Sequence, residues 1–195
     1  MNSPGLRERK KQKTRWSIQE HALRLFQEQG YEQTTVDQIA AAAEISPSTF
    51  FRYFKTKEDV VIEDEYDPLL LRLLAGQPAD RPIIPAVRDV VTQVLGQLSR
   101  DESDRLFQRT KLQLAVPALR ARMLDGFTGN MDMLTIGIAE RVGRPKDDPD
   151  VRVFVGALIG TMLVAIIDWT GSGGQENLGE CIDRALAYLE QGLPL

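Results

Sequence analysis

The stretch Ser46-Pro47-Ser48-Thr49-Phe50-Phe51-Arg52-Tyr53-Phe54 decides the fold. It predicts a short helix that begins after Ser46, because a serine hydroxyl accepts hydrogen bonds from the unpaired amides of a first turn and proline suits the first helical position. Phe50 and Phe54 lie four residues apart and share one buried face. The other face offers hydrogen-bonding groups to phosphate oxygens and base edges, those of Ser48, Thr49, Arg52 and Tyr53. Two such faces on one short helix are typical of a helix that reads DNA.

Two further helices are predicted upstream of this one. Thr35 and Gln38 have the spacing of a capping box and open a second short helix that runs to about Ala43. Only Glu44 and Ile45 then remain as a connection, so the two helices must cross sharply, as in a helix-turn-helix. Residues 16–29 carry apolar side chains at helical spacing before Gly30. We therefore expect three helices around one small core.

The ordered set of residues between about 10 and 60 resembles the TetR family of one-component transcriptional regulators. The resemblance is carried by Leu25-Phe26, Gly30-Tyr31, Thr34-Thr35-Val36, Ile39-Ala40, residues 46–54 and Lys57-Glu58. It implies an all-α fold with an N-terminal helix-turn-helix domain and a C-terminal helical domain for ligand binding and dimerisation. The family usually has glycine or arginine where Ser48 stands and leucine-tyrosine where Phe50-Phe51 stands, so this chain departs from it in the recognition helix.

Charge is distributed unevenly along the chain. The formal net charge is −4 overall, yet residues 1–57 hold ten Lys or Arg against six Asp or Glu, and the remainder holds fourteen against twenty-two. The basic residues concentrate between Arg7 and Arg15, just before the expected first helix, where they either reach phosphates or form a solvated tail. A basic N-terminal part and an acidic remainder fit a DNA-facing domain joined to a sensing domain.

Eight residues are candidates for contact with operator DNA. We expect Thr49 and Tyr53 to influence sequence choice and Thr35 and Lys57 to hold phosphates. The resemblance implies that Lys57 contacts the operator backbone, whereas the alternative is a lysine that is merely exposed. The complete set is Arg15, Thr35, Ser46, Ser48, Thr49, Arg52, Tyr53 and Lys57.

The rest of the chain is predicted to be helical. We expect an N-terminal basic arm and helix-turn-helix domain over residues 1–56, a connecting helix over 57–74 that Pro68 bends near Asp67, and a C-terminal domain over 75–195. After a proline-rich loop, the predicted helices span residues 86–98, 103–116, 117–142, 150–169 and 175–191.

The helix expected near residues 150–169 contains fifteen residues without a charge, from Val153 to Ile167. This run is shorter than the ~20 residues of a membrane span, and Asp168 ends it, so we expect a buried helix of a soluble protein. The resemblance implies that the last two helices of each subunit form a four-helix dimer interface. The expected interface residues are Val153, Gly156, Gly160, Leu178, Ile182 and Leu186.

The central helices supply an adaptable apolar set that fits a ligand cavity, although core packing explains the same residues. This set is Phe107, Met123, Phe127 and Met131, with Arg120 placed to meet a phosphate at the cavity mouth. Residues 67–70, 116–122 and 150–160 resemble a TetR subgroup that includes mycofactocin regulators, and this implies acyl-CoA-like ligands.

An enzyme with a helical fold is the competing class, and its requirements are poorly met. The sequence has no phosphate-cradling glycine loop and no nucleophile elbow, and its one histidine, His21, is far in sequence from its one cysteine, Cys181. We therefore expect no cofactor and no metal site. The predicted function is that of a homodimeric repressor, released from a pseudo-palindromic operator by a small apolar or acyl-CoA-like ligand. An activator or a ligand-strengthened DNA binder is the alternative. No signal-peptide core follows the basic run, so we expect a cytoplasmic protein.

Overall fold

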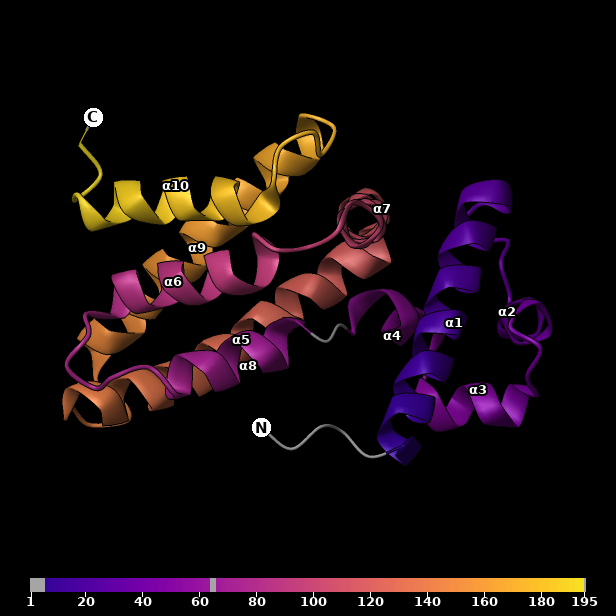
Figure 1. The fold of residues 1–195 in the computed structure, drawn as a ribbon, viewed down its shortest axis with the longest axis horizontal. Coiled ribbons are helices and arrows are strands. Elements are labelled where there is room, and N and C mark those ends of the chain that lie inside the picture. The colour runs from indigo at the N-terminus through magenta and orange to yellow at the C-terminus, as the bar shows by residue number, and fades with distance from the viewer. Residues whose placement is uncertain (1–5, 64–65, 195) are drawn as a thin grey trace.

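The computed structural model describes residues 6–63 and 66–194, apart from the side chains of residues 6–9, 67, 68 and 130. Over these residues the protein is helical and has no strand, so the predicted all-α class is confirmed. The helices are α1 (Leu6–Gln29), α2 (Val36–Ala42), α3 (Pro47–Tyr53), α4 (Lys57–Ile62), α5 (Tyr66–Ala75), α6 (Ile83–Leu95), α7 (Arg100–Ala115), α8 (Pro117–Val142), α9 (Pro149–Gly171) and α10 (Leu178–Glu190). Figure 1 shows α1–α4 as a head at one end of the molecule and α5–α10 as a larger body.

Local capping fixes the helix-turn-helix in the head. The Thr35 hydroxyl accepts from the Gln38 amide at 3.2 Å, and the Gln38 side chain accepts from the Thr35 amide at 2.8 Å, which confirms the predicted capping box. Ser46 caps α3 in the same manner by accepting from the Thr49 amide at 3.1 Å. Phe50 and Phe54 are buried in the core beneath these caps, as their spacing predicts.

The structure corrects two predictions about where helices begin. The basic run does not precede the first helix, because α1 begins at Leu6 and includes Lys10, Lys11, Lys13 and Arg15; residues 1–5 of the predicted arm lie outside the described residues. Residues 57–74 do not form one bent helix, because α4 ends at Ile62 and α5 begins at Tyr66. Pro68 therefore stands in the first turn of α5, where its missing amide hydrogen costs no helical hydrogen bond.

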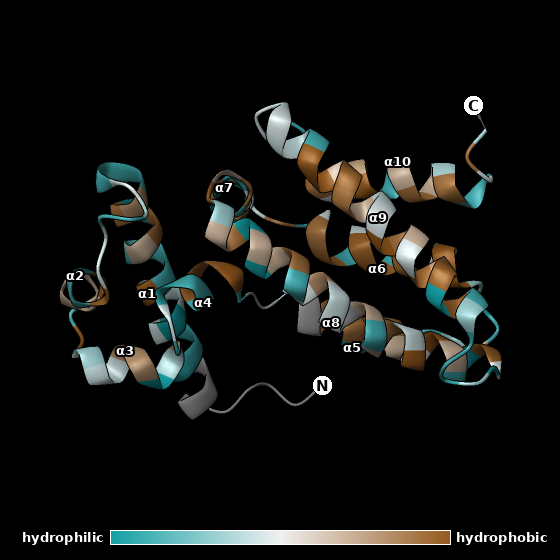
Figure 2. Cartoon of the chain, turned by 180° about the vertical axis from the view of Figure 1, so that it is seen from behind, coloured by the Kyte–Doolittle hydropathy of each residue, from teal (hydrophilic) through white to brown (hydrophobic). Residues whose placement is uncertain are grey.

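The body is built around Trp169 and the inner face of α10. Leu178, Ile182 and Leu186 are 5%, 1% and 0% exposed, and they pack with α6 and α9 of the same chain. The prediction that these three residues form the dimer interface is therefore wrong, because their apolar stripe is already buried within one protomer. Figure 2 shows the hydrophobic bands of α9 and α10 lying across the body.

The head is attached to the body mainly through α4. Val60 and Val61 are fully buried in the core of the head, and Leu119 of α8 is fully buried in that same core. Two polar contacts lie beside this apolar contact. Arg122 donates to Asp59 at 2.7 Å, and the side-chain amide of Gln113 donates to the carbonyl oxygen of Val61 at 2.8 Å. Helices α7 and α8 of the body thus each contact α4 directly.

Candidate DNA-binding surface and effector cavity

The exposed face of α3 carries a connected group of hydroxyls. The Ser46 hydroxyl donates to Thr49 Oγ1 at 2.9 Å and lies 2.9 Å from the Ser48 hydroxyl. Ser46 and Ser48 are exposed and Thr49 is half-buried, so the group is ordered while it remains open to solvent. Arg52 is also exposed, and its guanidinium lies 5.6 Å from the centre of the Tyr53 ring. The structure thus brings the polar residues predicted on this helix onto one accessible surface.

Arg15 has partners within the head. Its guanidinium donates to Glu63 at 2.6 Å and lies 4.5 Å from the centre of the Phe54 ring, so it joins α1 to the residue after α4. Contact between Arg15 and DNA stays a prediction.

Lys57 is turned toward the loop between α1 and α2. Its ammonium donates to the carbonyl oxygens of Tyr31 at 2.8 Å and Thr34 at 3.1 Å, and lies 4.2 Å from the centre of the Tyr31 ring. These contacts account for two of its three N–H donors. A phosphate contact by Lys57 stays a prediction, and the structure adds a second role, which is to hold the loop that leads into Thr35.

The neighbouring Glu58 strengthens the same attachment. The Tyr31 hydroxyl donates to Glu58 at 2.8 Å. Burial raises the pKa of Tyr31 above its ordinary value, and the hydrogen bond to Glu58 raises it further. Burial would also raise the pKa of Glu58, but hydrogen bonds from its own amide and from Tyr31 hold it below its ordinary value. The pair is therefore a neutral phenol donating to a carboxylate at neutral pH, and it fixes the start of α4 to the turn before α2.

Phe51 is a candidate DNA contact that the sequence analysis did not select. Its side chain is 54% exposed, although its ring meets Phe50 edge to face at 5.5 Å. Ser48 has Phe51 three residues on and Arg52 four residues on, so these three side chains share one face of the helix. In the major groove an exposed apolar ring can contact the methyl group of thymine. The helical spacing of Ser48 and Arg52 also predicts that Phe51 lies on this face.

The body contains a partly open apolar cavity of about 150 Å³ between α5, α6, α8 and α9. A second cavity of about 170 Å³ adjoins it and shares Leu70, Phe127, Met162 and Ile166 with it. The predicted ligand residue Phe127 lines both cavities, and Met123 lines the second. Most of the remaining lining comes from apolar residues of α5, α6 and α9, which sequence periodicity could not separate from ordinary core.

The other predicted ligand residues lie elsewhere. Phe107 meets Trp169 edge to face at 5.5 Å, and Met131 packs against the small core that contains Ile138 and Val151. Arg120 is exposed in the first turn of α8. None of the three lines either of these two cavities, so a role for them in ligand binding is an expectation that this geometry does not support.

Comparison with known families decides the identity of this fold. The family described as bacterial regulatory proteins, tetR family, matches residues 18–63, and the MftR C-terminal domain matches residues 81–194. The chain belongs to the TetR family. It is therefore a transcriptional regulator with a helix-turn-helix DNA-binding domain, and not an enzyme.

Relatives of this TetR-family regulator cover most of the chain. The HTH-type transcriptional regulator TcmR of Streptomyces glaucescens is 36% identical over 160 residues, which are 75% of this chain and 68% of TcmR. FadR from Bacillus subtilis, solved with stearoyl-CoA, superposes with a TM-score of 0.60 at 21% identity and covers 92% of this chain and 99% of its own. SmeT, the repressor of a Stenotrophomonas maltophilia multidrug efflux pump, superposes with a TM-score of 0.63 at 21% identity over 91% and 89% of the two chains. At these identities the two structures show the shared fold.

Lys57→Ala separates the two roles of this lysine. If the ammonium also meets a phosphate, we expect affinity for operator and scrambled duplexes to fall similarly and the slope of log affinity against log salt to lose about one unit. Binding measured at several salt concentrations checks this. An unchanged slope together with a lower melting temperature would leave only the loop-holding role.

The Phe51 ring is expected to contact the methyl groups of individual thymines in the operator. Replacing the contacted thymine by uracil removes one methyl group and should weaken operator binding by the wild-type protein by about 0.8 kcal/mol, the value of one buried CH₂ group. Phe51→Ala should abolish this difference while leaving binding to scrambled DNA little changed. Uracil scanning of each operator thymine with both proteins measures the coupling. Equal losses for the two proteins at every thymine would show that Phe51 reads no methyl group.

Proposed function

We propose that this regulator is a homodimeric repressor that binds a pseudo-palindromic operator and is released by a small apolar or acyl-CoA-like effector. The observation that carries the proposal is the presence in one chain of an accessible polar recognition face on α3 and adjoining apolar cavities in the body. We assign operator binding to the head and effector binding to the body, with the boundary between Glu63 and Tyr66. Such a repressor acts on chromosomal DNA in the cytoplasm.

The cavities fit a slender apolar molecule. Together they reach the lower end of the ~300–1,000 Å³ typical of small-molecule sites. FadR from Bacillus subtilis was solved with stearoyl-CoA and SmeT with triclosan, so regulators of this fold accept both acyl chains and compact apolar compounds. Support for an acyl chain in the present protein comes from the apolar lining, which includes Phe127 and Met162.

The outer face of α9 supports association of two subunits. Val153, Val164 and Ile167 are 73%, 58% and 44% exposed, and together with Ala157 and Gly160 they recur at alternating spacings of four and three residues. Among the described residues, no atom outside the adjoining backbone of α9 lies within 4 Å of a Cβ built at Gly156 or at Gly160, so these small residues leave room beside the helix. Exposed apolar faces of this kind mark contact sites.

This face also accounts for the hydropathy of α9. Its length and composition alone would allow α9 to cross a membrane, and only 22% of its most apolar window is buried within the protomer. Burial against the same helix of a second subunit removes the outer face from water without a bilayer. The proposed interface therefore keeps Val153, Gly156 and Gly160 from the sequence prediction and moves off the inner face of α10.

Gly160→Leu is expected to separate the subunits. The protomer has space for the new side chain, whereas a partner helix at this crossing does not, and overpacking costs about 1–3 kcal/mol at a site that the symmetry repeats. Light scattering over a dilution series should show a dimer dissociation constant raised about tenfold or more. Gly137→Leu on α8 is the matched control, since it too is an exposed helical glycine with open space around it. A Gly160→Leu variant that stays dimeric at every dilution would contradict this interface.

Filling the cavity should uncouple the effector from DNA. Met162 lines both cavities, so Met162→Trp is expected to keep operator affinity and to lose the release caused by lauroyl-CoA in the wild-type protein. Met133→Trp, at a methionine of α8 that is 51% exposed, is the matched control. Fluorescence anisotropy of labelled operator measures both quantities. Release of the Met162→Trp variant at the wild-type concentration of lauroyl-CoA would place the effector outside this cavity.

A further inference from the structure

The hydroxyls of Ser46, Ser48 and Thr49 form a hydrogen-bond network at the start of α3. Ser46 Oγ lies 2.9 Å from Ser48 Oγ and 2.9 Å from Thr49 Oγ1, and it accepts from the Thr49 amide at 3.1 Å. A serine hydroxyl has one proton to donate and two lone pairs that accept. The side chain that receives the single proton of Ser46 therefore decides what the other hydroxyls can offer to DNA.

The geometry of the network decides where this proton goes. The angles between Ser46 and Thr49 suit donation from Ser46 to Thr49, whereas the bond between Ser46 and Ser48 can run in either direction. If Ser46 donated to Ser48, its oxygen would face the Thr49 oxygen at 2.9 Å with no proton between them. Donation from Ser48 to Ser46 and from Ser46 to Thr49 makes both bonds, and successive hydroxyl bonds strengthen each other. The proton of Ser48 is therefore committed to Ser46.

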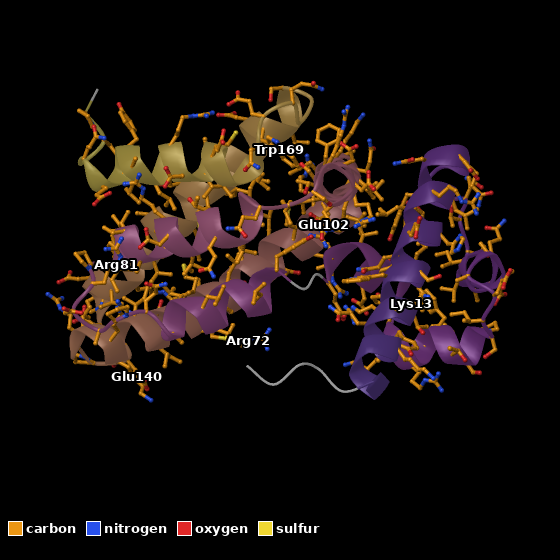
Figure 3. The ribbon with its side chains drawn as sticks, viewed as in Figure 1. Lys13, Arg72, Arg81, Glu102, Glu140 and Trp169 are labelled. Atoms are coloured by element: carbon orange, nitrogen blue, oxygen red, sulfur yellow. The ribbon has the colours of Figure 1, made fainter. Side chains whose placement is uncertain are left out.

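The Ser48 oxygen then faces solvent as an acceptor alone. Ser48 is exposed and is the second residue of α3. Figure 3 shows the side chains of α3 near the lower edge of the head, where they extend outward from the molecule. In helix-turn-helix proteins the N-terminal residues of the recognition helix contact base edges in the major groove. Ser48 stands at such a position, with its lone pairs available to a base.

We propose that Ser48 determines sequence specificity by accepting a hydrogen bond from a base amino group, and that Thr49 enforces this choice by holding the proton of Ser46. The donors of the major groove are the N4 amino group of cytosine and the N6 amino group of adenine, whereas guanine and thymine present the acceptors O6 and O4. An acceptor-only hydroxyl therefore favours adenine or cytosine at the base that it meets. The same polarity prevents Ser48 from binding a phosphate oxygen, which also only accepts.

Selection of binding sites from random duplexes by the full-length protein tests this polarity. The wild-type protein and Ser48→Ala are compared, and the position where their base preferences differ is the one that Ser48 reads. On matched duplexes the wild-type protein should favour adenine or cytosine there over guanine or thymine by about threefold to tenfold, the range of one neutral hydrogen bond. Ser48→Ala should lose this preference.

Two substitutions of Thr49 separate the network from the other roles of this residue. Thr49→Val keeps the shape of the side chain but removes the oxygen that accepts from Ser46. The Ser46 proton is then released, so Ser48 can either donate or accept, and the preference at its base should largely disappear. Thr49→Ser is the matched control, because it retains an acceptor oxygen at this place and should keep the wild-type preference.

Three results would overturn the inference. The first is a wild-type preference for guanine or thymine at the position that depends on Ser48, and the second is a Ser48→Ala variant with unchanged preferences at every position. The third is a Thr49→Val variant that melts as the wild-type protein does and keeps the full wild-type preference. A wild-type protein that selects no duplex would instead contradict DNA binding itself. The inference rests on DNA binding by this TetR-family regulator and is independent of the proposed effector and dimer.

Discussion

The DNA-binding head is held on the body by the packing of its last helix, α4, against α7 and α8. Leu119 of α8 is buried with Val60 and Val61, so the body supplies part of the core of the DNA-binding head. The Arg122 side chain is 48% exposed and the Asp59 side chain is 8% exposed, so the guanidinium satisfies a buried carboxylate from the edge of the contact. Asp59 also accepts from the Thr56 amide at 3.0 Å and thereby caps α4. Asp59 thus joins Arg122 of α8 to the first turn of α4, next to the buried contact of Leu119 with Val60 and Val61.

Hydrogen bonds and packed residues connect α4 to the recognition helix α3. In that same first turn, Lys57 donates to the carbonyl oxygens of Tyr31 and Thr34, and Glu58 accepts from the Tyr31 hydroxyl. These bonds join α4 to the turn before α2. That turn leads into the capping box at Thr35, and α2 packs against α3. An unbroken series of hydrogen bonds and packed residues therefore joins α8 to α3.

The sequence predicts this fold well wherever the signal is local. The caps at Thr35 and Ser46, the buried pair Phe50 and Phe54, and the bounds of α8 all follow from residues within one or two turns of one another. Packing between helices that are distant in the sequence cannot be predicted from such local signals. The stripe of Ile182 and Leu186 has the same spacing whether it meets another subunit or the same chain, and only the fold shows that α6 and α9 already cover it. The ligand residues could not all be predicted for a related reason. The local sequence does not show that Phe107 packs against Trp169 whereas Phe127 lines the cavity.

In the proposed homodimer, an effector in the body changes the separation of two heads that are joined through α9. Half-sites on one face of DNA lie about 34–36 Å apart, or a multiple of that distance, so a change in head separation translates into affinity. The most direct measurement is electron paramagnetic resonance of the distance between nitroxide labels on Glu32→Cys in a Cys181→Ser background, since Glu32 is exposed in the turn between α1 and α2. Operator DNA should give one narrow distance distribution, and lauroyl-CoA should shift or broaden it. An unchanged distribution, at a lauroyl-CoA concentration that releases the operator, would contradict the account.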